Sequence, residues 1–403
     1  MSPSPRALDG ILVLDVGSFL AGPSAATVMS DFGAEVIKVE TPDGGDPNRR
    51  LGELPGLPVS EHNYSWLLDS RNKKSLAVDL SKPEGREAFL RLAARADVLV
   101  TNFPPAVLAR LRLTYEELKP LNPRLVYALV TGYGEVGEEA NKPGFDINAW
   151  WARSGLMDLV HAPDGPPSHS MPGMGDHPTG MVLFGAVMLA LYQREKTGRG
   201  AKVSTSLMAS GAWANSTLIQ ASLCDAKFPE RMPREGCRNP IINFYRCKDD
   251  RWFILTVLRA EKGWEPFTRA IERPELASDP RFATFESRQA NAAELVAILD
   301  AVFASRDWAG WRERLKSYGV TFGPIARIED VKDDQQMTAA EVIVPMAEGP
   351  FRTVSNPVFV AGQPKVPAGR APELGEHTDE ILRGLGYDAA GITELRRLRV
   401  IAP

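Results

Sequence analysis

Short apolar strands alternate with helical segments through the first part of the chain, and this order constrains the fold more than any other feature. Residues 11–16 form a run of branched apolar side chains, residues 25–32 have a helical pattern, and residues 35–40 resemble a second strand. Two strands joined by one helix within about 30 residues predict a right-handed βαβ unit and a parallel sheet. The pattern recurs over residues 82–101 and ends with a strand at 125–130. We therefore expect a doubly wound α/β domain.

The middle of the chain has a different texture, which predicts a second, smaller domain. Residues 225–240 form a polar linker that contains prolines, and residues 243–258 have the pattern of a β-hairpin, with helical segments after it. We predict a large domain over 1–224, a small α+β domain over 225–324, and a C-terminal segment, 325–403, that returns to the large domain.

The composition narrows the class of protein. The chain has 47 Lys and Arg and 51 Asp and Glu, a formal net charge of −4, so no nucleic-acid binder is indicated. Three cysteines without a C-x-x-C pair indicate neither a disulfide framework nor a zinc site, and they suit a reducing compartment. The most apolar stretch, 181–192, is shorter than the roughly 20 residues that span a bilayer, and residues 1–10 lack the apolar segment of a signal peptide. We expect a cytoplasmic protein that binds no metal, nucleic acid or membrane.

Two segments could contact phosphate groups. The turn at 17–23 contains two glycines ahead of a helix, but it lacks the G-x-G-x-x-G fingerprint of dinucleotide binding, so a tight turn is the simpler interpretation. Arg71, Lys73 and Lys74 place three cations within four positions, a density that suits phosphate. A solvated surface loop would explain the same cluster.

Asp176 is the most suggestive single carboxylate. It follows Gly175 just before a predicted helix, and Pro178 suits the first turn of that helix. The helix N-terminus would stabilise a reactive carboxylate, yet aspartate is also a common N-cap. His177 could serve as a base or could simply be packed, and no G-x-S-x-G elbow supports a serine triad. The residues alone leave a structural and a catalytic role open.

Trp150 and Trp151 are adjacent, so their side chains point to different sides of any element. One of them could face an apolar ligand while the other packs in the protein.

Taken together, the motifs of the chain resemble the family III coenzyme A transferases, a group that includes formyl-CoA transferase, carnitine CoA-transferase and α-methylacyl-CoA racemase. The resemblance covers nearly the whole chain. It rests on motifs at residues 8–10, 14–15, 21–23, 33–40, 45–46, 102–103, 122–124, 131–134, 194–200 and 374–378.

The resemblance implies a role for Asp176. The nucleophilic aspartate of the family lies in a Gly-Asp motif ahead of the helix that leads to residues 194–200, and Gly175-Asp176 matches it. Asp176 would attack an acyl-CoA thioester, pass through a mixed anhydride and form an aspartyl-CoA thioester before an acceptor acid takes over. Backbone N–H groups near 173–177 would stabilise the oxyanions. Coenzyme A is thus expected as a substrate, with no tightly bound cofactor.

The resemblance also implies a binding site and an assembly. We expect two chains to form a homodimer of interlocked rings. The residues expected to contact CoA are Arg71, Lys73, Lys74, Asn102, Phe103 and Arg110 at the nucleotide end, and Phe19, Leu20 and Ala21 at the thioester end.

Residue 145 separates two branches of the family. The racemases carry a histidine base in the context Gly-His-Asp-Ile-Asn, where this chain has Phe145, which cannot move a proton at the α-carbon. A transferase is favoured, with a racemase as the alternative. The segment 145–155 looks most like the branch that acts on 2-hydroxy and arylpropanoate acids. The expected substrate pocket comprises Phe145, Asp146, Trp150, Trp151, Gly175 and His177.

Overall fold

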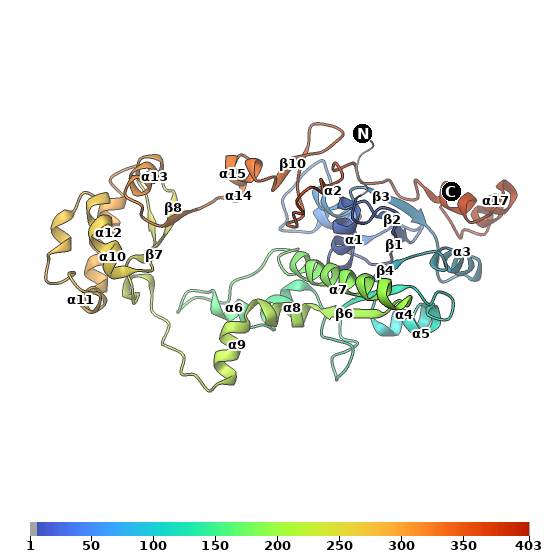
Figure 1. Ribbon diagram of the computed structural model, residues 1–403, viewed down its shortest axis with the longest axis horizontal. Helices are drawn as coiled ribbons and strands as arrows, with labels where there is room; N and C mark the ends of the chain where they lie inside the picture. The colour runs from blue at the N-terminus through green and yellow to red at the C-terminus, as the bar shows by residue number, and fades with distance from the viewer. Residues whose placement is uncertain (1–5, 403) are drawn as a thin grey trace. The chain divides into compact units, whose positions relative to one another are not determined.

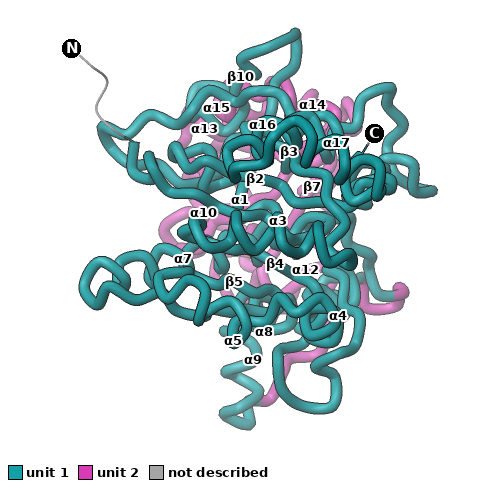
Figure 2. Tube along the Cα trace, turned by 90° about the vertical axis from the view of Figure 1, so that its right-hand side faces the viewer, with its two compact units in different colours: residues 1–161, 167–226, 338–403 teal, residues 162–166, 227–337 magenta. Residues whose placement is uncertain are grey.

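The computed structural model describes residues 6–402, which divide into two compact units (Figure 2). The first comprises Met1–His161, Pro167–Ala226 and Thr338–Pro403, and the second comprises Ala162–Pro166 and Lys227–Met337. The second unit includes Ala162–Pro166, which the prediction places in the large domain. Its longer segment begins two residues after the predicted start at 225 but extends beyond 324. The reason is that Arg327 Nη2 donates to the Asp250 carbonyl at 3.2 Å and Arg251 pairs with Asp330.

A six-stranded sheet forms the centre of the first unit (Figure 1). Every neighbouring pair of strands is parallel, and the order is β3-β2-β1-β4-β5-β6. The order reverses between β1 and β4, which is the place where doubly wound proteins bind ligands. The strands are β1 (Leu12–Asp15), β2 (Glu35–Glu40), β3 (Lys73–Ala77), β4 (Val98–Thr101), β5 (Val126–Thr131) and β6 (Lys202–Ser206).

Alternating apolar side chains give the sheet two buried faces. Leu14 contributes to a core that it shares with α3 (Pro83–Ala93), whereas Val13 contributes to a core on the other face with α1 (Ala21–Asp31) and α7 (Asp176–Thr197). Parallel strands covered on both faces explain the nearly continuous apolar runs in the sequence. The first core also includes α4 (Pro105–Leu111), α5 (Tyr115–Leu118), α16 (Thr378–Gly384) and α17 (Ala389–Arg397).

The C-terminal segment packs in the first unit. Ile401 forms an antiparallel bridge with Val78, and the Asp79 amide donates to the Val400 carbonyl at 2.8 Å. Near the start of α16 the His377 amide donates to the Ser75 carbonyl at 3.0 Å. A short hairpin of β10 (Ile343–Pro345) and β11 (Arg352–Val354) precedes this region.

The second unit is an α+β domain with its own core. The predicted hairpin is confirmed as β7 (Ile242–Arg246) and β8 (Trp252–Thr256), and β9 (Phe322–Ile325) pairs antiparallel with β8. Phe253, Phe303 and Trp311 are fully buried at the centre. The helices of this unit are α10 (Ala260–Ala270), α11 (Phe285–Ala290), α12 (Ala292–Phe303), α13 (Trp308–Ser317) and α14 (Ile328–Val331).

Several elements of the first unit differ from the prediction. Residues 76–80 look strand-like in the sequence, but the strand begins at Lys73. Residues 207–224 have the pattern of one apolar helix, but the helix breaks at Asn215 into α8 (Leu207–Ala214) and α9 (Ser216–Leu223). The segment 43–58 has the glycines and prolines of an irregular loop, but it contains a 3-10 helix, η1 (Pro47–Glu53). The remaining elements near it and the cavity are α2 (Tyr64–Asp69), η2 (Asp146–Ala152) and α6 (Leu156–Leu159). Within residues 6–402, no helix is both long and apolar enough to cross a membrane.

Candidate active site

A cavity of about 680 Å³ opens at the carboxyl ends of the central strands of the first unit. Its walls include Ser18–Ala21 after β1, Asn102–Pro105 after β4, Val130–Gly132 at the end of β5, and Leu207 after β6. η1 and the start of η2 close the remaining sides. The cavity therefore occupies the switch point of the sheet, where the fold favours ligand binding.

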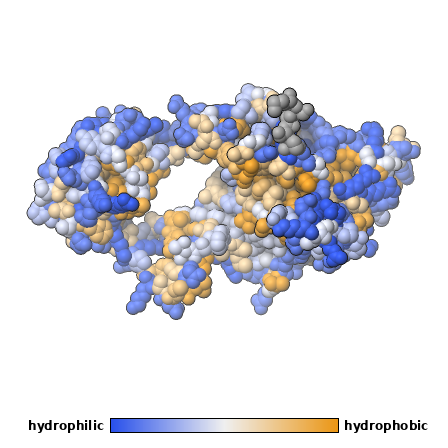
Figure 3. Space-filling model, viewed as in Figure 1, coloured by the Kyte–Doolittle hydropathy of each residue, from blue (hydrophilic) through white to orange (hydrophobic). Residues whose placement is uncertain are grey.

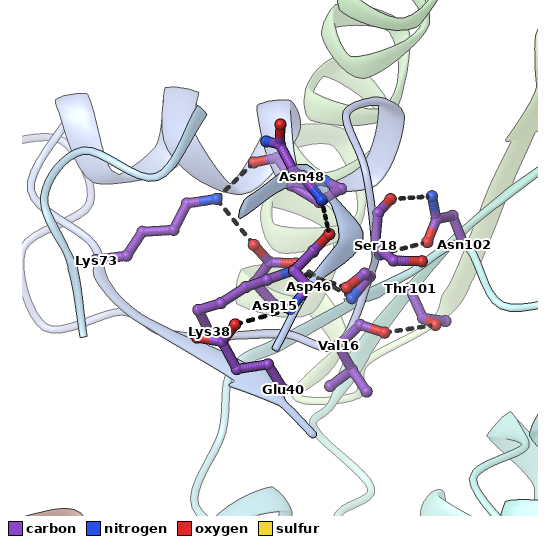
Figure 4. Close-up of polar contacts among 12 residues, drawn as sticks. Asp15, Val16, Ser18, Lys38, Glu40, Asp46, Asn48, Lys73, Thr101 and Asn102 are labelled. Atoms are coloured by element: carbon purple, nitrogen blue, oxygen red, sulfur yellow. Dashed lines mark hydrogen bonds and ion pairs between the residues drawn. The ribbon is translucent and has the colours of Figure 1, made fainter. Parts of the chain in front are cut away.

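The turn after β1 is held in an uncommon conformation. Phe19 has φ of 58°, which a non-glycine side chain adopts only when its surroundings enforce it. Asn102, the residue after β4, does so: its Oδ1 accepts from the Ser18 amide at 2.8 Å, and its Nδ2 donates to the Ser18 carbonyl at 2.7 Å (Figure 4). The Phe19 amide donates to Asp46 Oδ1 at 2.9 Å. These bonds hold Phe19 in the wall of the cavity.

Buried charges behind this turn stabilise it further (Figure 4). Lys38 Nζ lies 2.6 Å from Asp46 Oδ2 and donates to the Gly17 carbonyl at 2.6 Å, and Lys73 Nζ lies 2.8 Å from Asp15 Oδ2. Burial opposes the ionisation of Asp15, but Lys38 and Lys73 outweigh it and hold the pKa of Asp15 below its ordinary value. These groups serve the structure, because both lysine side chains are fully buried.

The structure does not place Arg71, Lys73 and Lys74 where the sequence analysis expects a phosphate site. β3 begins at Lys73, so the cluster enters the sheet instead of forming a surface loop. Arg71 binds Asp31 through two hydrogen bonds of 3.0 and 2.7 Å, and Lys74 lies 2.8 Å from Glu35 and 2.7 Å from Glu380. None of the three cations lines the cavity.

Other cations do line the cavity. Arg50 in η1 is exposed and forms no ion pair with any residue in the described part of the chain. Lys142 also lines the cavity, although it lies 2.7 Å from Glu139. Arg110 lies on the exposed side of α4 and is absent from the cavity wall.

Asp176 lines the cavity as the first residue of α7, and it does not cap that helix. The N-cap is Gly175, which makes no side-chain bond, and no group within residues 6–402 donates a hydrogen bond to the Asp176 carboxylate. The structural alternative left open by the sequence is thus wrong. Burial, followed by the charge of Asp146, raises the pKa of Asp176 to about 7, while His177 acts in the opposite direction. The carboxylate is poised between its two charge states near neutral pH.

The turn that leads to Asp176 is clamped from both sides. Asp146 Oδ2 accepts from the amides of Gly173, at 2.8 Å, and Gly175, at 3.4 Å. His177 Nδ1 lies 3.0 Å from the Gly173 carbonyl oxygen, and its Nε2 lies 3.1 Å from Asp69 Oδ1. Burial disfavours the charged imidazole, yet Asp69 outweighs it and raises the pKa of His177 to about 9.

This clamp narrows the expectation that amides near 173–177 stabilise oxyanions, because it engages four amides of that segment and does not include the Asp176 amide. The Gly173 and Gly175 amides already donate to Asp146, the Met174 amide donates to the Met171 carbonyl at 3.2 Å, and the His177 amide donates to the Gly173 carbonyl at 3.1 Å. These four donors shape the turn and are not free for a substrate.

The two tryptophans support the turn and do not line the cavity. Their rings stack in parallel with centroids 5.9 Å apart, and Trp150 Nε1 donates to Ser210 Oγ at 3.2 Å. Trp150 packs so closely on Gly175 that a Cβ there would lie 2.7 Å from the Trp150 side chain. The aromatic pair in the cavity wall is instead Phe19 and Phe145, edge to face with centroids 6.1 Å apart.

Half of the predicted site residues lie in the wall of the cavity. The predicted residues that line the cavity are Phe19, Leu20, Ala21, Asn102, Phe103, Phe145, Asp146 and Asp176. Gly175 and His177 lie directly behind it and shape it. The main part of the wall that the sequence analysis missed is η1. It contributes Pro47, Arg50 and Leu51, and Leu54 follows directly after it. Asp46, which caps η1 by accepting from the Asn48 amide at 2.9 Å, followed by Pro47, is a helix-start pattern that could have revealed it.

Comparison with known protein families identifies the family of this chain. The sequence profile of CoA-transferase family III matches residues 8–378 of the chain. The chain belongs to CoA-transferase family III.

Relatives within CoA-transferase family III span the full chain. The (R)-2-hydroxy-4-methylpentanoate CoA-transferase of Clostridioides difficile is 31% identical over 400 residues, 98% of this chain and 99% of that protein. The cinnamoyl-CoA:phenyllactate CoA-transferase of Clostridium sporogenes is 32% identical over 405 residues, 98% of each protein. A crystal structure of a CaiB/BaiF family protein from Brucella suis has a TM-score of 0.84 at 30% identity, covering 95% of this chain and 100% of that chain. The predicted family and enzyme class are confirmed.

Proposed function

We propose that this family III CoA-transferase moves CoA from an acyl-CoA to a free carboxylic acid, with Asp176 as the covalent nucleophile. The observation that carries the proposal is the state of the Asp176 carboxylate. It lines the cavity, accepts no hydrogen bond from the described residues, and has a pKa raised to about 7 by burial and Asp146. A desolvated carboxylate without bound donors is a stronger nucleophile than a capped or ion-paired one.

The reaction balances without any further reactant. An Asp176 oxygen attacks the thioester carbonyl carbon, the C–S bond breaks, and a mixed anhydride and the CoA thiolate form. The thiolate attacks the Asp176 acyl carbon and releases the donor acid as its carboxylate, which leaves an aspartyl-CoA thioester. The acceptor carboxylate then displaces the thiolate to form a second anhydride. Attack of the thiolate on the acceptor acyl carbon gives the new acyl-CoA and restores Asp176.

The walls of the cavity suggest how the substrates lie. The turn at Phe19–Ala21 would contact the thioester end, and Asn102 and Phe103 would contact CoA farther along the strand ends. Arg50 would meet the phosphates, since it is the cation of the wall without an ionic partner in the described chain.

An apolar acyl group suits the rest of the wall. Phe19, Phe145, Leu51 and Leu54 line the cavity, and Phe145 is 55% exposed. The resemblance to transferases of 2-hydroxy-4-methylpentanoate and of phenyllactate supports 2-hydroxy acids with a branched or aryl side chain as acceptors. Racemisation is less well supported, because Phe145 offers no base and Asp146 is bound to the Gly173 and Gly175 amides.

We also propose that the protein is a homodimer in the cytoplasm, and exposed apolar side chains on the first unit support the dimer. Leu189 and Tyr192 on α7, Trp213 on α8 and Leu223 on α9 are all more than half exposed. Figure 3 shows hydrophobic residues gathered over α9. A second copy of the chain would bury these side chains, and sedimentation equilibrium at micromolar concentration tests this directly.

An oxygen-labelling experiment tests the covalent route. With an acceptor acid carrying ¹⁸O in both carboxylate oxygens, the mechanism leaves one ¹⁸O atom on Asp176 after the first turnover and up to two after repeated turnover, and peptide mass spectrometry would find them there. Deuterium exchange at the α-carbon of the acyl-CoA without any acceptor, together with an unlabelled Asp176, would instead establish the racemase.

A further inference from the structure

The His177 ring bridges two acceptors beside the reactive carboxylate. Nδ1 lies 3.0 Å from the Gly173 carbonyl oxygen, and Nε2 lies 3.1 and 3.3 Å from the two oxygens of Asp69. A neutral imidazole has only one N–H to donate, whereas the Gly173 carbonyl and an ionised Asp69 carboxylate can only accept. The geometry therefore calls for the doubly protonated ring.

The position of Asp69 suits it to stabilise the positive charge on the His177 ring. Asp69 is the last residue of α2, and its side chain is only 3% exposed. Within residues 6–402, the His177 ring is the one hydrogen-bond donor to its carboxylate. Loss of the ring would leave a buried carboxylate without a direct partner, which proteins avoid.

The backbone accommodates the ring at one place. Gly173 has φ of 92°, and a Cβ on it would lie 2.9 Å from Cε1 and Nδ1 of His177. The imidazole therefore packs directly on the bare glycine. On the amide side of the same turn, Asp146 accepts from Gly173 and Gly175. The turn is therefore held by the His177 imidazolium at the Gly173 carbonyl and by the Asp146 carboxylate at the Gly173 and Gly175 amides.

We propose that Asp69 and His177 form a positioning pair, in which buried Asp69 keeps His177 charged so that it both locks the Gly173–Gly175 turn and favours the ionised form of Asp176. This inference rests on the proposed role of Asp176 and adds to it. Three carboxylates act on this site: Asp69 from α2, Asp176 from α7, and Asp146 from η2. The His177 side chain is 40% exposed, so solvent weakens but does not remove its effect.

The charge on His177 changes the pKa of Asp176 in a known direction. The imidazolium lowers the pKa of Asp176, whereas Asp146 and Asp69 raise it. Replacing His177 by a neutral residue leaves the carboxylates unopposed, so Asp176 would ionise only at a higher pH.

The test is the pH profile of kcat/KM for His177→Gln. We expect the midpoint of the acid limb to move up by about one pH unit. Below that midpoint kcat/KM should fall about tenfold, because a neighbouring opposite charge shifts the pKa of a carboxyl group by one unit or more. His161→Gln is the matched control. It removes another histidine that lies 3.2 Å from an aspartate, Asp158, but one outside the cavity wall, and its profile should match the wild type.

A second measurement does not depend on activity. Titration of the His177 imidazole by NMR in the full-length protein should give a pKa well above the ordinary histidine value, and Asp69→Asn should lower it. An ordinary pKa in the wild-type protein overturns the proposal, as does an unmoved acid limb in His177→Gln with a uniform loss of kcat. If Asp176→Asn stays active, the covalent mechanism fails instead, and the NMR result still decides the ion pair.

Discussion

The Asp146 and Asp176 carboxylates both line one cavity, and the same Asp146 that holds the turn ahead of Asp176 also raises its pKa. The charge of Asp146 thus changes the pKa of Asp176, the proposed nucleophile. The arrangement leaves the Asp176 carboxylate without hydrogen-bond donors among the described residues, while its pKa lies near neutral pH.

Removal of the Asp146 charge should shift the pH profile. In Asp146→Asn the new side-chain amide oxygen can still accept from the Gly173 amide, but the side chain no longer repels the charge on Asp176. The pKa of Asp176 should fall, and the acid limb of kcat/KM should move to lower pH by about one unit. This direction is opposite to that expected for His177→Gln, so a shift of the same sign in both variants would contradict the electrostatic account.

Asp176 should lower the stability of the folded protein at alkaline pH. Its folded pKa of about 7 lies above the ordinary value of 3.8, so the unfolded chain loses this proton first and stability falls as pH rises from about 4 to about 7. Asp176→Asn should therefore unfold in urea with a free energy about 1–3 kcal/mol higher than the wild type at pH 8. The gain should be much smaller at pH 4.5. An equal gain at both pH values would show that the charge is not responsible.

Gly175 should not tolerate a side chain. A Cβ there would lie 2.7 Å from Trp150 and 2.9 Å from Asp146 Cβ, so Gly175→Ala should displace the turn and lower kcat at least about tenfold, since small displacements of reacting groups are costly. Gly384→Ala, in helix α16 and outside the cavity wall, is the control, because a Cβ at Gly384 meets no atom within 4 Å. It should retain activity. Full activity in Gly175→Ala would contradict the tight packing.

Arg50 should matter for CoA affinity, while Arg110 should not. Arg50 lines the cavity without an ionic partner in the described chain, whereas Arg110 is exposed away from the cavity wall. We expect Arg50→Ala to raise the Kd for CoA about tenfold in titration calorimetry at low salt, with a smaller effect at high salt. Equal losses in Arg50→Ala and Arg110→Ala would restore the role that family resemblance gives to Arg110.

The sequence predicted the elements with regular patterns well and the charged segments poorly. β2 has the bounds that its pattern predicts, because branched residues fill its buried register. Arg71, Lys73 and Lys74 look like a surface cluster in the sequence, because their partners Asp31, Asp15 and Glu380 are 40 to 306 residues away in the chain. Only the folded sheet brings these charges together. The Asp69–His177 contact, 108 residues apart, escapes prediction for the same reason.

Two residues that family resemblance singles out, Asp176 and Phe145, lie in the wall of the cavity. The resemblance draws attention to them through a Gly-Asp motif and a replaced histidine, whereas local chemistry alone leaves Asp176 open between a helix cap and a catalytic residue. Trp150 is expected in the pocket, yet it packs behind Gly175, since the direction of a side chain depends on the π-helical turn η2 that the sequence pattern does not reveal.

The most direct test of the account is to trap the covalent intermediate. The protein would be mixed with an acyl-CoA, treated with hydroxylamine or borohydride, and examined by intact-mass and peptide mass spectrometry, with Asp225→Asn, at an exposed position, as the matched control. We predict a modification that maps to Asp176 in the wild type and in Asp225→Asn and that is absent from Asp176→Asn. An unmodified Asp176 in protein that still binds CoA and transfers it would contradict the proposed mechanism.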